Sequence, residues 1–359
     1  MNTDANIYAY HGSIAFNQWM DDLLHDFTRD VETIMGDNLT ALILGGGYGR
    51  GEGGIEIIDG QELPYNDLDF TIVVDNIGAV PHKEMDRISA VYAAKIKIHV
   101  DFSRPLTVSA IRNWPPWLMW YDLLNGHIIL SGPQDILTAN APECVKAPLP
   151  PIEALRLLLN RGAGLLWAMR VVREAEPEPD RGFVIRNYYK LLLALGDAVL
   201  ISRKRFATPY RGRDLLLEEL AAEDASVHRL NLQDHYREAL KFKFSPHEYG
   251  DTIIDADILK EAVNLWTTIL LDTEMLRTGR QWTRPREYAE DPFVREKSMN
   301  TLAERPKNIL RNMRFKRLSW LHPREWLYRE IPHLLINTDP DQGWTGRSAT
   351  AMAVWNQYN

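Results

Sequence analysis

Three aspartates lie in short β-type segments, and their spacing suits metal-assisted chemistry. Asp67 and Asp69 belong to the run 66–74, and alternate residues of a strand point to the same face. Two carboxylates side by side repel each other unless a cation lies between them, and Mg²⁺ favours carboxylate oxygens together with substrate phosphates. Asp101, near the end of the alternating run 95–102, can lie beside this pair. Three such carboxylates can hold two metal ions, one activating a hydroxyl and one stabilising a leaving pyrophosphate.

A glycine-rich segment, GGGYGRGEGG at residues 45–54, follows a predicted strand upstream of these aspartates. Glycine lets backbone N–H groups approach a phosphate and adopts the positive φ of anion-binding turns. We therefore expect a phosphate cradle, with Arg50 contacting a phosphate or anchoring the loop, and Glu52 in a structural role. The spacing Gly49-x-Gly51-x-x-Gly54 also matches a dinucleotide fingerprint. That motif must open a helix, whereas the residues that follow are β-type, so we discount this interpretation.

In this order the motifs resemble the DNA polymerase β-type nucleotidyltransferase superfamily, especially its small-molecule and minimal members, which have a C-terminal helical domain. Members carry a Gly-Gly or Gly-Ser turn, an Asp-x-Asp pair and a third Asp. The resemblance covers about residues 39–138. It implies that Gly46 and Gly47 hold the triphosphate and that Asp67 and Asp69 bind both metals. Asp101 would complete one metal site and help to deprotonate the acceptor hydroxyl.

The chain departs from the family pattern in two places. Gly47 stands where Ser is common, and the stretch from the glycines to Asp67 is longer than usual. The turn-like residues 58–60 indicate an inserted hairpin there. In the helical part, Lys190 and Asp197 are seven residues apart and so share one helix face. By the resemblance Lys190 would contact the triphosphate; a plain interhelical ion pair is the alternative.

Positioning these groups requires an α+β chain with a mixed first domain. We predict an amphipathic segment over 13–35, a helix over 82–94, and strands over 39–44, 68–74, 95–102 and 126–130. Beyond the proline cluster at 147–151, helical periodicity predicts helices over 152–173, 182–203, 214–222, 230–243 and 256–277.

The expected organisation is a nucleotidyltransferase-type mixed β-sheet domain flanked by helices, followed by an all-α domain. The catalytic domain would span residues 1–147 and the helical, acceptor-binding domain 148–280, with the active site in the cleft between them. A C-terminal extension, 281–359, would pack on the helical domain. Its segment 303–330 carries eight Lys/Arg against three Glu. A basic amphipathic segment suits a membrane surface, a nucleic acid or an acidic partner, or is simply a solvated helix face.

Composition excludes several classes of function. The 359 residues are 45% hydrophobic, enough for a large core, and a net charge of −8 disfavours a long nucleic acid as substrate. Cys144 is the lone cysteine, so no internal disulfide can form. The N-terminus is not signal-like and no apolar stretch is long enough to span a bilayer. We expect a soluble, cytoplasmic protein.

The expected reaction is transfer of a nucleoside monophosphate, AMP from ATP, to a hydroxyl of a small molecule or a protein. Two Mg²⁺ ions, with Mn²⁺ as a substitute, would assist, and pyrophosphate would leave. The alternative is a non-catalytic nucleotide-binding or interaction module, or an antitoxin-like partner of a toxin. The presence of all three carboxylates argues against a non-catalytic module.

Overall fold

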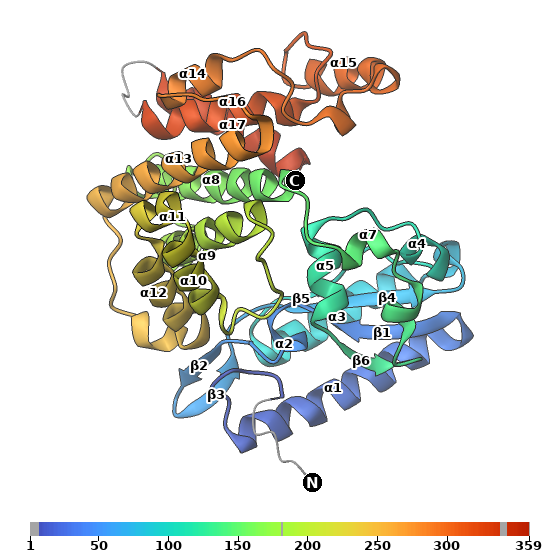
Figure 1. The fold of residues 1–359 in the computed structure, drawn as a ribbon. Coiled ribbons are helices and arrows are strands. Elements are labelled where there is room, and N and C mark those ends of the chain that lie inside the picture. The colour runs from blue at the N-terminus through green and yellow to red at the C-terminus, as the bar shows by residue number, and fades with distance from the viewer. Residues whose placement is uncertain (1–6, 181, 338–342, 359) are drawn as a thin grey trace. The chain divides into compact units, whose positions relative to one another are not determined.

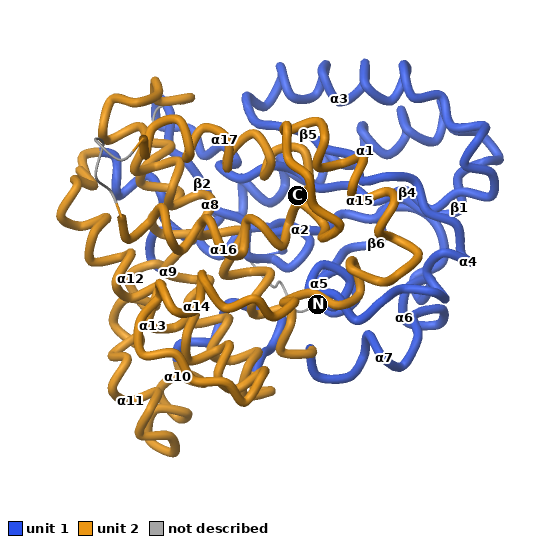
Figure 2. Tube along the Cα trace, turned by 90° about the horizontal axis from the view of Figure 1, so that it is seen from above, with its two compact units in different colours: residues 1–149, 206–214, 240–250 blue, residues 150–205, 215–239, 251–359 orange. Residues whose placement is uncertain are grey.

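The structure is a computed structural model that describes residues 7–180, 182–337 and 343–358, and it divides into two compact units (Figures 1 and 2). Unit 1 comprises residues 1–149, 206–214 and 240–250, and unit 2 comprises residues 150–205, 215–239 and 251–359. After its first 149 residues the chain thus returns twice to unit 1, which the sequence analysis did not foresee. The predicted three-part division at 147/148 and 280/281 stays a prediction.

Unit 1 is built on a four-stranded mixed sheet in the order β5-β4-β1-β6. β1 (Leu39–Leu44) pairs antiparallel with both β4 (Leu68–Val74) and β6 (Ile128–Ser131), and β5 (Val100–Phe102) runs parallel to β4. β1 and β4 have the predicted bounds, and β6 begins two residues later than predicted. The described residues of unit 2 form helices joined by loops, with no strand. The predicted α+β class, a mixed sheet domain followed by helices, is confirmed.

Side chains of the sheet alternate between two apolar layers. Leu42 and Leu44 pack with α1 (Ile14–Met35) and α3 (His82–Ile96), whereas Ala41 and Ile43 face the opposite layer. The short helices of that second layer are α4 (Val108–Ile111), α5 (Leu118–Asn125), α6 (Ile136–Asn140) and α7 (Glu143–Lys146). Both faces of the sheet are therefore covered, and polar groups can gather only where its strands end.

The predicted strand over 95–102 is wrong in its first half. α3 continues to Ile96, which is buried with Met85, Ile88 and Tyr92. Their spacing of three and four residues is helical, and this burial outweighs the apolar alternation that suggested a strand. Lys97 ends the helix in the left-handed conformation, φ 59°, and its N–H donates to the Ala93 carbonyl. Only residues 100–102 remain as strand.

The inserted hairpin that the sequence predicted is present. β2 (Ile55–Ile58) pairs antiparallel with β3 (Gln61–Pro64). Asp59 and Gly60 form the turn with φ of 52° and 77°. Two successive positive φ angles give the turn whose twist matches that of paired strands.

Unit 2 is organised around α8 (Ile152–Val172), α9 (Phe183–Ser202) and α13 (Ala256–Thr278). The buried Trp266 ring lies against Gly162, and its Nε1 donates to the Leu158 carbonyl at 2.8 Å. The predicted helix over 230–243 is present as one helix over 232–244, and Asn231, in the left-handed conformation, separates it from a short helix over 225–230 that was not predicted. No helix among the described residues is long and apolar enough to cross a membrane. The remaining helices are α10 (Arg213–Glu223), α11 (Ala225–Leu230), α12 (Leu232–Phe244), α14 (Pro285–Glu290), α15 (Arg305–Met313), α16 (Pro323–Ile336) and α17 (Trp344–Tyr358).

Candidate active site

Asp69 and Asp101 lie directly opposite each other on neighbouring strands. In the parallel pairing of β4 with β5, Asp69 is the partner of Asp101 and Phe70 is the partner of Phe102. The two phenyl rings lie 5.7 Å apart in the layer that α1 and α3 cover. Because side chains alternate along a strand, the two aspartates point to the other face, where both are exposed. The fold thus brings together two of the three predicted carboxylates.

The glycine turn after β1 lies against Asp69. The N–H of Gly45 donates to the Asp69 carbonyl at 2.8 Å. Gly46 opens the short helix α2 (Gly46–Gly49) with φ of 61°, and a Cβ at this position would overlap Asp69 Oδ2. Glycine is therefore required at residue 46 both by its backbone conformation and by the space that the carboxylate takes.

A cavity of about 360 Å³ lies where the glycine turn, the two strands and α5 meet. Four predicted site residues line it, namely Gly46, Arg50, Asp69 and Asp101. Other polar or aromatic groups in its wall come from Thr71, Ser103, Trp120 and Asp122.

Asp122 is a carboxylate that the sequence analysis missed. It lies on α5, a helix that was not predicted, and lines the same cavity as Asp69 and Asp101. The signal available was a single acidic residue inside the apolar stretch 118–124. Asp122 is half-buried, and a nearby cation favours a carboxylate at such a position.

Asp67 lies just before β4, is exposed, and is not among the described residues that line the cavity. Tyr48 ties the glycine turn to the residues that precede it. The buried Tyr48 hydroxyl donates to the Gly54 carbonyl at 2.6 Å and accepts from the N–H groups of Tyr65 and Asn66 at 2.9 and 3.2 Å. Burial raises the pKa of Tyr48 well above its usual range, with Asp67 adding to the shift, so the phenol stays neutral.

Glu52 connects the glycine-rich segment to residues 206–214 of the same unit. Its buried carboxylate accepts from the N–H groups of Tyr210 and Arg211 at 3.0 and 2.8 Å and lies 3.5 Å from Arg50 Nε. These contacts are structural, and they position Arg50 at the cavity wall. This link could not be predicted from the sequence, because the two segments are far apart along the chain.

Gly47 and Lys190 are the predicted phosphate contacts outside the cavity wall. Gly47 is in the glycine turn and has space for a Cβ at ordinary contact distance. Lys190 lies on α9 in unit 2 and is exposed. Asp197, on the same helix, is buried and accepts from the Tyr236 hydroxyl at 2.8 Å. Triphosphate binding by these residues stays a prediction.

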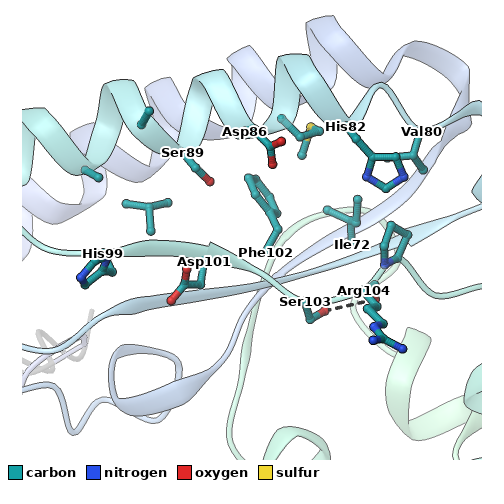
Figure 3. Close-up of a pocket in the computed structure, with 15 residues that line it drawn as sticks. Ile72, Val80, His82, Asp86, Ser89, His99, Asp101, Phe102, Ser103 and Arg104 are labelled. Atoms are coloured by element: carbon teal, nitrogen blue, oxygen red, sulfur yellow. Dashed lines mark hydrogen bonds between the residues drawn. The ribbon is translucent and has the colours of Figure 1, made fainter. Parts of the chain in front are cut away.

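Asp101 also borders a second cavity, of about 510 Å³, beside α3 (Figure 3). His82, Asp86 and Ser89 of α3 line it, together with His99 next to the strand. Figure 3 shows Asp86 and Ser89 projecting from the helix toward the strand that carries Asp101. Asp101 thus borders both cavities.

The donor set suits a hard divalent cation with only two protein carboxylates. Within the part of the chain that the structure describes, no group of three or more His, Cys, Asp or Glu residues is arranged to hold a metal ion. Mg²⁺ commonly takes one or two carboxylates and completes its shell with water and substrate phosphates. Asp69 and Asp101, with the open glycine turn beside them, fit that manner of binding. A two-ion site that includes Asp67 stays a prediction.

Comparisons with known proteins identify no family for this chain. No family model matches the chain, and no curated protein matches it. Among solved structures it matches a nucleotidyltransferase-like protein from Exiguobacterium sibiricum, with 12% identity, over 82% of this chain and 92% of that chain, at a TM-score of 0.24. At this TM-score the likeness supports no assignment, so a function has to be inferred from the residues of the site.

Proposed function

We propose that the chain is a metal-dependent nucleotidyltransferase that moves AMP from ATP to a hydroxyl of a small molecule or a protein. The observation that carries the proposal is the in-register pair Asp69 and Asp101, held against a glycine turn in which Gly46 has no room for a Cβ. Paired carboxylates beside a side-chain-free turn can serve a cation and a polyphosphate together. The proposal includes a cytoplasmic location, which suits a chain with a single cysteine.

Each part of the site has a role in this reaction. The glycine turn admits the triphosphate, and the Arg50 guanidinium offers it a positive charge at the cavity wall. Asp69 and Asp101 would hold Mg²⁺, or Mn²⁺ in its place; when bound, the cation supplies charge stabilisation to the phosphoryl oxygens. The acceptor oxygen bonds to the α-phosphorus, and the bond from phosphorus to the pyrophosphate oxygen breaks. Asp101 accepts the hydroxyl proton, and pyrophosphate leaves.

The second cavity gives the acceptor a route to Asp101. It is lined by polar groups that hydrogen-bond hydroxyls well, namely Asp86, Ser89 and His99. An acceptor that reaches from this cavity over the edge strand β5 would bring a hydroxyl to Asp101, whose carboxylate points to the opposite face of the sheet. This arrangement favours a polar acceptor rich in hydroxyl groups.

A non-catalytic nucleotide-binding module, or an antitoxin-like partner of a toxin, is the second candidate. It is favoured by the placement of Asp67, which lies just before β4 and does not line the cavity of Asp69 and Asp101. The two candidates share nucleotide binding and differ in turnover. Release of pyrophosphate in the presence of a hydroxyl acceptor would therefore separate them.

The test is a calorimetric titration of the protein with each of the four nucleoside triphosphates in the presence of Mg²⁺. The double variant Asp69→Asn/Asp101→Asn removes both charges with little change of shape. Asp37→Asn, at an exposed position in the same unit, is the matched control. We expect metal-dependent binding of ATP by the wild type and the control, and none by the double variant. Equal binding by all three proteins would refute the proposed site.

A further inference from the structure

Helix α15 (Arg305–Met313) is attached to unit 2 through polar side chains. Asn308 and Asn312, one helical turn apart, are buried. The Asn308 amide donates to the Met299 carbonyl at 3.0 Å, and the Asn312 amide donates to the Leu321 carbonyl at 2.7 Å. The inner face of the helix is therefore built from asparagine amides that bind loop carbonyls.

The apolar face of α15 points to solvent. Leu310 and Met313 are 67% and 59% exposed, and the exposed Pro306 completes a row with spacings of four and three residues. At about 100° per residue this row is centred roughly 150° from the Asn308 and Asn312 side chains. A helix on a protein surface normally shows the opposite arrangement, with its apolar stripe toward the core.

The segments on either side of α15 carry further exposed apolar side chains. Leu318 is 90% exposed, and Leu302 and Trp320 are also exposed. The Trp320 ring lies 4.4 Å from the guanidinium carbon of Arg305, so aromatic and cationic groups are adjacent. Isolated exposed leucines are ordinary, but several within one short segment mark a binding surface. We name Leu302, Leu310, Met313, Leu318 and Trp320 the α15 patch.

The α15 patch lies in a strongly basic segment of an acidic chain. Residues 302–320 contain six Lys/Arg and one acidic residue, Glu304, whereas the whole chain has a net charge of −8. Lys307 and Arg311 pair with Glu304 at 2.8 and 3.1 Å. Within the described residues Arg314 forms no ion pair, and neither does Lys316; both side chains are exposed. The surface thus combines apolar side chains with uncompensated positive charge.

We propose that the α15 patch docks the protein on an anionic phospholipid surface. Its apolar side chains would enter the boundary between headgroups and acyl chains, while the lysines and arginines face the lipid phosphates. A nucleic acid would satisfy the cations but offers no hydrocarbon layer for Leu310 and Met313. An anionic bilayer surface satisfies both kinds of side chain at once. This inference does not depend on the chemistry of Asp69 and Asp101.

The experiment is cosedimentation of the full chain with vesicles of phosphatidylcholine alone or mixed with phosphatidylserine. Leu310→Ser/Met313→Ser removes the apolar row, and Arg314→Gln/Lys316→Gln removes two charges. Val91→Ser, which alters a side chain that is 57% exposed on α3, is the matched control. Thermal unfolding of each variant checks that the fold is intact.

We expect the wild type and the Val91→Ser control to bind the phosphatidylserine vesicles and to bind phosphatidylcholine alone at least roughly tenfold more weakly. The charge variant should bind roughly 30-fold more weakly than the wild type, since each cation near the surface contributes about 1 kcal/mol. The apolar variant should lose at least roughly tenfold. The proposal is overturned if both double variants bind like the wild type, or if the wild type does not distinguish the two lipids. It is also overturned if the wild type binds only oligonucleotides or a second copy of itself.

Discussion

Gly46 lies so close to Asp69 that a Cβ on the glycine would overlap the Oδ2 atom of the carboxylate. Gly45, next to it, donates its N–H to the Asp69 carbonyl at 2.8 Å. The glycine turn and the carboxylate therefore form one structural element. A change in either one displaces the other, and nucleotide binding should report it.

Gly46→Ala should abolish metal-dependent ATP binding. The new methyl group displaces the Asp69 side chain, and the positive φ of 61° strains any residue that has a Cβ, at a cost of about 1–2 kcal/mol. Gly60→Ala is the control, because Gly60 has φ of 77° but open space around it. It should lose a similar amount of stability and keep ATP binding. Titration calorimetry and urea unfolding measure both effects; ATP binding by Gly46→Ala that equals the wild type would contradict the geometry.

Glu52→Ala should lower the free energy of unfolding by about 2–5 kcal/mol, since two part-buried N–H groups, of Tyr210 and Arg211, lose their hydrogen bonds to a charged acceptor. Glu52→Gln keeps one acceptor oxygen and should lose less. Urea unfolding ranks the two variants. Hydrogen exchange at residues 210 and 211 should accelerate most in the alanine variant, and unchanged protection there would show that Glu52 does not hold this segment.

Tyr48→Phe should lower the free energy of unfolding by about 1–3 kcal/mol, because its buried hydroxyl serves the Gly54 carbonyl and two N–H groups. Tyr92→Phe removes a hydroxyl that donates to Asp30 at 3.0 Å, so it should lose less. Chemical unfolding of both variants compares the losses. A larger loss for Tyr92→Phe would show that the Tyr48 tether contributes little.

Stability should fall as the solution is acidified, because His322 is neutral in the folded protein. Its Nδ1 accepts from the Arg324 N–H at the start of α16, and burial, with Arg311 and Arg324 nearby, lowers its pKa from 6.5 to about 4. Below pH 6.5 the unfolded chain therefore binds the extra proton, and this contribution to the unfolding free energy is lost progressively toward pH 4. His322→Asn can cap the helix without titrating. Urea midpoints across this range should slope less for the variant than for the wild type; parallel slopes would rule out His322 as the source.

Much of the framework around the site could be predicted from sequence because local pattern and tertiary burial agree there. β1 and β4 are long apolar runs, and β4 carries Asp69 at the predicted position. The strand that carries Asp101 was predicted too long, because residues 95–98 alternate like a strand while Ile96 is buried as part of α3. The sequence of residues 95–98 fits both a strand and a helix, and the burial of one face of α3 favours the helix.

The rest of the site depends on contacts between distant segments. Asp122 reaches the cavity from α5, whose apolar sequence shows no clear period, and Glu52 binds residues more than 150 positions away. No local pattern encodes either contact, since each arises only when the chain has folded. The reversed orientation of α15 is a similar case, because its pattern predicts which residues share a face but not which face is buried.

The most direct test of the central claim is a titration of Mn²⁺, followed by electron paramagnetic resonance, in the presence of an ATP analogue that cannot be cleaved between the α and β phosphates. Asp69→Asn and Asp101→Asn are measured singly beside the Asp37→Asn control. We predict that the wild type and the control take up Mn²⁺ with the analogue, and that each single variant binds it at least roughly tenfold more weakly, as expected when one of two protein carboxylates is lost. Equal Mn²⁺ uptake by all four proteins would show that the paired aspartates are not the metal site.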